Sequence, residues 1–236
     1  MRFRHADTIW ADHPELAAGV VYVDGVGADR AAPGAIDRYA GMAADRLAGR
    51  TESELAEIKA WRRTFAGMGL KPTQYRCAAE SLLRRFRRDG TLPTIHPVID
   101  LCNAASLAYA IPIAVLDLAA VTGNLEVRYA SGDERYVTFG GETEHPAPGE
   151  VTYVDDDGWA HARRWTNRQS GRSAVSAHTG SVLVVAEAVH DTAAADVPEL
   201  IEDLRVELAL LGGVHASYLT ADRPEYTVAG QASLPA

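Results

Sequence analysis

The chain has 236 residues, of which 47% are hydrophobic and 23% charged, and this suits one large domain with a buried core. Pro112 and Asp117 interrupt the most apolar stretch (104–121), residues 1–7 lack a signal peptide's apolar segment, and two cysteines build no disulfide framework. We therefore expect a cytoplasmic protein without a membrane partner, and the net charge of −9 argues against nucleic acid, because phosphates attract basic surfaces.

The first 90 residues are predicted to be mostly helical after one strand. The β-branched run at 19–23 is typical of a strand. Thr51 and Glu54 form a capping-box pattern at the start of a helix, and Gly90 is a helix-ending signal. The helical spacing of apolar residues, with arginines on the opposite face of the third segment, predicts helices over 35–47, from 51 to about 66, and over 76–88.

The second half is predicted to be rich in short strands. Asn103 is a plausible N-cap for a helix over 104–110, and Asp157-Gly158 is typical of a hairpin turn. Strands are expected at 115–116, 125–129, 135–139, 151–154, 159–165 and 181–187, and a closing helix at 198–211. The pattern predicts an α+β fold with a single domain over 1–221, its helical part at 1–90, and a C-terminal tail at 222–236.

The charge is unevenly distributed along the chain. Residues 62–88 hold eight basic side chains and one acid, Glu80, and a second basic group follows at 163–172. The simplest interpretation is a solvated helix face, and the alternative is contact with a phosphate backbone. For the second interpretation the candidate RNA-binding residues are Arg84, Arg85, Arg88, Arg163 and Arg164.

Familiar catalytic and cofactor motifs are missing from the sequence. It contains no nucleophile elbow, P-loop, dinucleotide fingerprint or zinc-protease helix, and its eight histidines show no ligand-like spacing. We therefore predict no cofactor and no metal site. The run 155–158 superficially resembles a calcium loop, but it lacks the remaining ligands of such a loop and is better explained as a turn.

A few residues are candidates for chemistry. Cys102, with His96, Asp100 and Asn103 close in sequence, could form a thiol nucleophile site, although its apolar neighbours favour a buried small residue. The Asn103 amide could instead hold a ligand. His178 and Thr179 precede the strand at 181–187, where polar residues often line a cleft, and their alternative is a simple turn.

The order of several segments resembles a known family. Tyr75-Arg76, the run 80–85, Leu92 to Asn103, and Ile111 to Asp117 are similar to the B3/B4 domain, with further agreement at 128–134, 163–170 and Thr179. This domain is the tRNA-binding and editing module of the phenylalanyl-tRNA synthetase β subunit, and it also occurs as stand-alone proteins. The resemblance covers residues 70–190, and residues before 65 are closer to the stand-alone members.

The resemblance implies a pocket in which a positioned water hydrolyses the ester of a mischarged tRNA. Asn103 matches a family asparagine and Asp117 a family aspartate, whereas Cys102 replaces a threonine and Ala114 a histidine. The family's tyrosine-hydroxyl acceptor, a glutamate, falls on Val185, with Glu187 two residues further along the same strand face.

The small pocket turn of the family falls near Trp165 and Thr166, which are bulkier. Without the histidine and the acceptor glutamate, a pocket loses its means of selecting a phenolic hydroxyl. We therefore do not expect tyrosine editing to follow from the fold alone.

Three functions remain open, and we favour the first over the second. The first is trans-editing of a misacylated tRNA, with Asn103, Thr179 and Glu187 as catalytic candidates. The second is an RNA- or ligand-binding module that has lost the chemistry, and the third is a hydrolase of small amino-acid derivatives. The substrate-binding candidates, for an amino acid or aminoacyl ligand, are Cys102, Asp117, Trp165, Thr166, Asn167 and His178.

Overall fold

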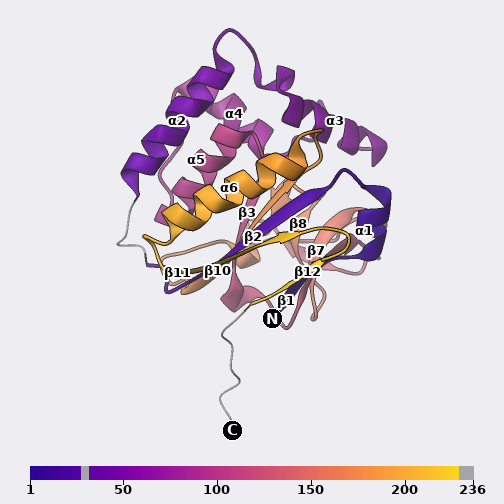
Figure 1. Cartoon of the computed structure of the whole chain (residues 1–236). Helices are drawn as coiled ribbons and strands as arrows, with labels where there is room; N and C mark the ends of the chain where they lie inside the picture. Colours follow the sequence, from indigo (N-terminus) through magenta and orange to yellow (C-terminus); the bar gives the residue numbers. More distant parts are fainter. Residues whose placement is uncertain (28–31, 229–236) are drawn as a thin grey trace.

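The computed structural model describes residues 1–27 and 32–228, which form helices and two β-sheets (Figure 1). The α-helices are α1 (Asp7–Asp12), α2 (Pro33–Leu47), α3 (Ala56–Gly67), α4 (Ala78–Asp89), α5 (Pro97–Tyr109) and α6 (Ala193–Leu208), with short 3-10 helices η1 (Glu52–Glu54), η2 (Leu118–Ala120) and η3 (Gly171–Ser173). The strands are β1 (Arg2–His5), β2 (Ala17–Asp24), β3 (Ile113–Asp117), β4 (Leu125–Tyr129), β5 (Arg135–Val137), β6 (Thr143–Glu144), β7 (Val151–Asp155), β8 (Trp159–Arg163), β9 (Arg168–Gln169), β10 (Ser181–Ala188), β11 (Gly213–Leu219) and β12 (Glu225–Thr227). The predicted α+β fold is confirmed.

The strands belong to two separate sheets. The smaller sheet has the antiparallel order β11-β2-β10-β3. The larger sheet has the order β12-β1-β4-β7-β8-β5-β6, with β9 paired to β8, and is mixed because β1 runs parallel to β4 and β5 parallel to β8. Along the described chain, no helix combines the length and the apolar character needed to cross a membrane.

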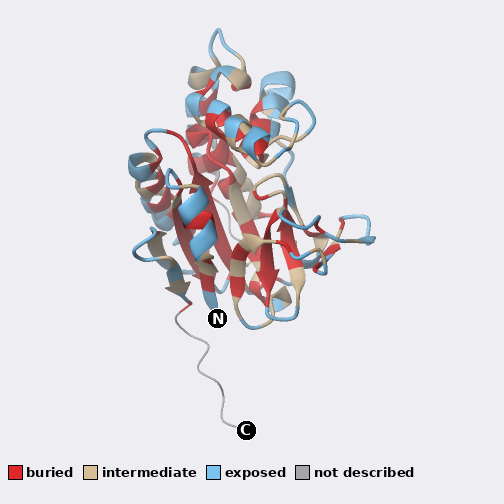
Figure 2. Cartoon of the chain, turned by 90° about the vertical axis from the view of Figure 1, so that its right-hand side faces the viewer, coloured by how far each residue is buried: buried red, intermediate tan, exposed pale blue. Residues whose placement is uncertain are grey.

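The core lies on both faces of the smaller sheet. Side chains alternate across a strand, so Val182 and Val184 of β10 pack with α2, α5 and α6, while Leu183 and Val185 pack toward the larger sheet. The resulting order is helices, smaller sheet, larger sheet, and Figure 2 shows the buried strands of the two sheets beneath the helices. A polar residue on the second face of β10 is therefore held between two sheets.

Local signals explain several helix ends. The capping box is present as predicted: the Thr51 backbone N–H donates to Glu54 Oε2 over 2.7 Å, although the box opens η1 and α3 begins only at Ala56. Gly90 ends α4 at φ +73°, a left-handed conformation that glycine adopts without steric cost.

The prediction of a helix that begins after Asn103 is wrong. α5 begins at Pro97, whose fixed φ suits the first helical position, and the His96 ring accepts from the Val98 N–H over 3.4 Å. Asn103 therefore lies inside the helix and caps nothing. The closing helix also begins earlier than predicted, at Ala193, and includes Pro198.

The two ends of the described chain contain elements that the sequence pattern does not predict. β12 pairs antiparallel with β1, so that Tyr226 lies opposite Phe3, and Val228 is buried in the core. The tail predicted from residue 222 thus includes a strand, and residues 229–236 lie outside the described part of the chain.

Glu134 links the turn at 131–134 to the pH dependence of stability. Burial raises the pKa of Glu134. This effect is outweighed by backbone N–H donors, including those of Ser131 and Gly132, and by the Arg128 guanidinium, which together lower the pKa to about 2. A carboxylate whose pKa is lowered by folding stabilises the fold at pH values above its pKa in the unfolded state. This stabilisation is lost as the pH falls through its pKa in the folded state. We expect urea unfolding to show a loss of about 3 kcal/mol between pH 5 and pH 2, and Glu134→Gln to flatten this dependence. Identical pH profiles for the two proteins would contradict the assignment.

Candidate functional site

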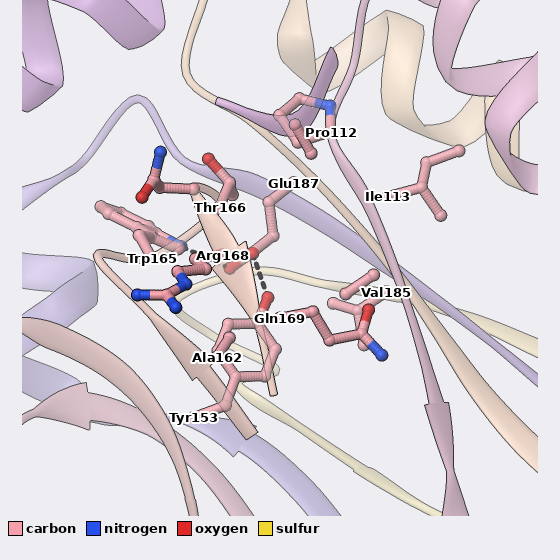
Figure 3. Close-up of a pocket in the computed structure, with 13 residues that line it drawn as sticks. Pro112, Ile113, Tyr153, Ala162, Trp165, Thr166, Arg168, Gln169, Val185 and Glu187 are labelled. Carbon is pink, nitrogen blue, oxygen red and sulfur yellow. Dashed lines mark hydrogen bonds between the residues drawn. The ribbon is translucent and has the colours of Figure 1, made fainter. Parts of the chain in front are cut away.

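A small cavity lies between the two sheets near the end of β10. Its volume is about 50 Å³, on the order of one or two water molecules. Pro112, Ile113 and Ala114 line it from the β3 side, and Val185 and Glu187 from β10 (Figure 3). The other lining residues are Ala78, Tyr153, Ala162, Trp165, Thr166, Asn167, Arg168 and Gln169.

Glu187 is the centre of a buried hydrogen-bond network at this cavity. Its Oε1 lies 2.6 Å from His5 Nε2 and accepts from Trp165 Nε1 over 2.8 Å, while its Oε2 accepts from the Tyr153 hydroxyl. A carboxylate can only accept, so the proton of the first pair belongs to His5 Nε2. All four side chains are at most 2% exposed.

Three donors leave the carboxylate little capacity for a ligand. Each carboxylate oxygen has two lone pairs, so Oε1 is saturated and Oε2 can accept one more hydrogen bond. Burial, together with the neighbouring Glu187, raises the pKa of Tyr153 well above its usual value, so the phenol stays a donor. The network is therefore chiefly structural, with one acceptor position left at the cavity.

Trp165 occupies the space beside Glu187. Its φ is +58° and that of Arg164 is +48°, and the Trp165 N–H donates to the Val151 carbonyl over 2.8 Å. This left-handed turn directs the indole into the interior, where it packs edge-on against Trp61 (5.1 Å between ring centroids) and His13 (4.8 Å). A bulky ring thus fills most of the region that a ligand side chain would need.

The structure brings together four of the predicted site residues. Trp165, Thr166, Asn167 and Glu187 line the cavity, and the shared strand face of Val185 and Glu187 is as expected from the period of two. The Asn167 amide is already used, since it donates to the Arg76 carbonyl over 2.6 Å. The Thr166 hydroxyl is buried and has no hydrogen-bond partner among the described residues.

Asn103, Thr179 and Glu187 do not share a site, contrary to the expectation of a joint catalytic set. Asn103 lies on α5, on the helix side of the smaller sheet, in a separate depression with Phe86 and Asp100. Thr179 lies before β10. The strand starts at Ser181, six residues before Glu187, which separates the start of the strand from Glu187 by about 20 Å.

Asp117 and His178 also lie away from the cavity. The Thr179 hydroxyl donates to Asp117 Oδ2 over 2.7 Å, closing the turn that leads into β10, and His178 is exposed on that turn. Their arrangement matches the alternative interpretation as a turn.

Cys102 is a core residue of α5. It is 1% exposed, and burial raises the pKa of its thiol far above the usual range, so the nucleophilic thiolate does not form near neutral pH. His96 and Asp100 stay at the start of the helix, where the Asp100 carboxylate accepts from the Ile95 N–H. The thiol-nucleophile hypothesis is therefore wrong.

The predicted RNA-binding arginines fall into two groups. On α4, Arg84, Arg85 and Arg88 are 58, 50 and 74% exposed. Arg163 is instead 8% exposed and bound between Glu144 and Glu150 at 2.6–3.0 Å, so it is not free to contact a phosphate. Arg164 is partly buried, with its guanidinium 4.7 Å from the centre of the Tyr75 ring.

His5 and Tyr153 are the site residues that the sequence does not indicate. They come from β1 and β7, the two strands that flank β4 in the larger sheet. The only signal at His5 is the alternation of Arg2 and Arg4 with Phe3 and His5, which matches an exposed–buried strand pattern.

Glu57, His190 and Asp196 form a polar cluster with candidate ligand atoms within 4.8 Å of one another. Arg46 binds Glu57, and Asp196 Oδ2 is already contacted by His190 Nε2 (2.7 Å) and the Thr192 hydroxyl (2.6 Å). Because these contacts balance and occupy the carboxylates, the cluster is explained as an ion-pair network.

A family model described as "B3/4 domain" matches residues 60–198. The phenylalanine–tRNA ligase β subunit of Coxiella burnetii is 41% identical over 63 residues, covering 27% of this chain and 8% of the relative. That of Cereibacter sphaeroides is 29% identical over 92 residues, covering 39% of this chain and 11% of the relative. The chain thus spans about a tenth of the length of these curated relatives. The fold is also similar to a solved N-terminal fragment of the phenylalanyl-tRNA synthetase β-subunit from Pyrococcus horikoshii. The match covers 90% of this chain and 49% of the fragment, with a TM-score of 0.49 and 9% identity.

Proposed function

The chain belongs to the B3/4 domain family, since the family model matches more than half of its residues, and on this premise we propose that it is a tRNA-binding module. The relatives with sequence similarity are subunits of a tRNA ligase, which makes tRNA the first RNA to consider. In this function the protein binds tRNA whether or not it hydrolyses the ester of a bulky amino acid.

The observation that carries the proposal is the excess of guanidinium groups around α4. Glu80 is shared by Arg62 and Arg76, at 2.5 and 3.3 Å. Glu52 is likewise shared by Arg84 and Arg87, and Asp89 by Arg85 and Arg88. Each carboxylate thus neutralises one of two cations, so the surface stays basic in a chain of net charge −9. A basic surface of this kind is the electrostatic footprint of phosphate binding.

The experiment is a tRNA-binding assay with a charge-matched control. Arg84→Gln, Arg85→Gln and Arg88→Gln combined should weaken tRNA binding at least tenfold, because each lost phosphate contact reduces counterion release. The combined control Arg38→Gln, Arg205→Gln and Arg223→Gln changes the net charge equally on α2, α6 and the loop before β12. It should change the affinity little. Equal losses in both variants would reduce the interaction to nonspecific attraction and contradict the proposed surface.

A second candidate function is hydrolysis of a tRNA ester that carries a very small amino acid. It is favoured by the unpartnered Thr166 hydroxyl and by the one acceptor position left on Glu187, both at the cavity. A volume of about 50 Å³ admits a methyl-sized side chain and excludes a phenol ring.

A deacylation panel tests this second candidate. Alanyl- or glycyl-tRNA should be hydrolysed above the spontaneous rate, Thr166→Val should reduce that rate, and tyrosyl- and phenylalanyl-tRNA should be stable. Asn103→Ala is the matched control, since Asn103 lies on the far side of the smaller sheet. If no ester is hydrolysed faster than in buffer, the hydrolase hypothesis fails and the binding proposal is unaffected.

A further inference from the structure

A second set of exposed cationic and aromatic side chains lies in the β-rich half of the chain. The guanidinium carbons of Arg135 and Arg172 lie 3.9 and 4.4 Å from the centre of the Trp159 ring. Close by, Phe139 is 74% exposed, the highest value among the exposed large hydrophobic residues described. We call these four residues the Trp159 face.

The position of Phe139 follows from the local fold. β5 ends at Val137, two residues earlier than the predicted strand, and the chain turns back at Gly141 (φ +87°) into β6. The backbone at Phe139 packs against η3: a Cβ added at Gly171 would lie 3.2 Å from Phe139 Cα. The Phe139 backbone thus lies next to η3, which contains Arg172, and the Phe139 side chain is exposed.

The two guanidinium groups are free to bind an anion. Among the described residues, neither guanidinium makes an ion pair. The Arg135 guanidinium donates one hydrogen bond, to the Asp157 carbonyl over 3.1 Å, and within the same residues the Arg172 guanidinium donates none. The exposed acids on neighbouring turns are Asp133, Glu142, Asp156 and Asp157. None of them has a carboxylate within ion-pair distance of Arg135 or Arg172.

This geometry suits an unpaired nucleotide. Contact with the indole holds a guanidinium plane flat and leaves its other face open for stacking, while its N–H groups can reach a phosphate. An exposed phenylalanine next to such cations is a stacking surface for a base, and stacking of this type tolerates any base. Paired RNA buries its base faces in the helix, so the Trp159 face would select single-stranded segments.

We propose that the Trp159 face binds single-stranded RNA, with a base stacked on Phe139 and adjacent phosphates on Arg135 and Arg172. That the segment is an unpaired part of a tRNA rests on the proposed function. The RNA-binding surface of the chain would then have two parts, a cationic one on α4 for the phosphate backbone and this one for exposed bases.

Tryptophan fluorescence gives a direct test, because the other three tryptophans, Trp10, Trp61 and Trp165, are buried and only Trp159 is partly exposed. An oligouridine of about 12 nucleotides, within the usual range of single-strand site sizes, should protect Trp159 from acrylamide quenching. Phe139→Ala and Arg172→Lys should each weaken oligouridine binding about tenfold, the second because lysine keeps the charge but loses the planar group. Arg205→Ala on α6 should have no effect.

The outcomes separate this proposal from the proposed function. Unchanged quenching at saturating oligouridine, or equal affinities for wild type, Phe139→Ala and Arg172→Lys, overturns the Trp159 face. If tRNA binding depends on the α4 arginines but not on Phe139, the proposed tRNA-binding function holds and the Trp159 face has no part in it. Oligouridine binding that depends on Phe139, in a protein that ignores tRNA, supports the Trp159 face and rejects tRNA as the partner. Circular dichroism of each variant checks that these exposed substitutions leave the fold intact.

Discussion

Glu187→Ala is expected to lower the free energy of unfolding by about 3–5 kcal/mol. The substitution leaves the His5 ring, the Tyr153 hydroxyl and the Trp165 indole N–H without their acceptor in the interior between the sheets. Water that enters the enlarged cavity is a weaker acceptor than the carboxylate for the three donors, so much of the cost of removing their buried anionic partner remains. Urea unfolding followed by circular dichroism measures the loss.

Two further variants make the result specific. Glu187→Gln keeps one acceptor oxygen and should cost less, about 1–3 kcal/mol. Glu199→Ala removes an exposed glutamate from α6 and should change stability by less than about 0.5 kcal/mol. If Glu187→Ala is as stable as Glu199→Ala, the buried network does not hold the two sheets together.

Trp165→Gly is expected to open a ligand cavity beside Glu187 at a cost of about 3 kcal/mol. Removal of a buried tryptophan ring costs about 3–5 kcal/mol, and glycine recovers part of this because it adopts φ +58° without strain. Free indole should bind in the cavity and restore stability, since its N–H can donate to Glu187 as the Trp165 side chain does.

The control for this rescue is a ligand without the donor. Benzothiophene has the shape of indole but no N–H, and it should raise the melting temperature of Trp165→Gly less than indole does. Trp61→Ala provides a second control, because the Trp61 indole N–H has no partner in the described part of the chain and its cavity should not distinguish the two ligands. Equal rescue by indole and benzothiophene in Trp165→Gly would show that Glu187 does not face the space left by the ring.

Elements with strong local signals are predictable from this sequence. β10 follows from its β-branched run, and the ends near Thr51 and Gly90 follow from capping chemistry. β1 and β12 are too short for an alternating pattern to stand out. They form through tertiary pairing, in which β1 lies between β12 and β4. Asn103 has the chemistry of an N-cap, but Pro97 begins the helix six residues earlier.

Strand alternation predicts the candidate site only within β10, and the family resemblance adds Trp165, Thr166 and Asn167. The shared face of Val185 and Glu187 follows from alternation along β10, whereas the contact of Glu187 with His5 joins residues 182 positions apart. The basic sequence neighbours of Arg163 predict an exposed RNA-binding residue. Arg163 is buried because it pairs with Glu144 and Glu150, which are distant in the sequence and do not affect the local composition around residue 163.

The central claim, that this acidic chain carries a tRNA-binding surface, is tested most directly by tRNA affinity as a function of salt. A phosphate-binding surface with three or more contacts predicts that log K falls linearly with log salt concentration, with a slope of about −2 or steeper. It also predicts a shallower slope for the Arg84, Arg85 and Arg88 variant. A wild-type affinity that is undetectable at low salt, or that does not change with salt, would contradict the claim.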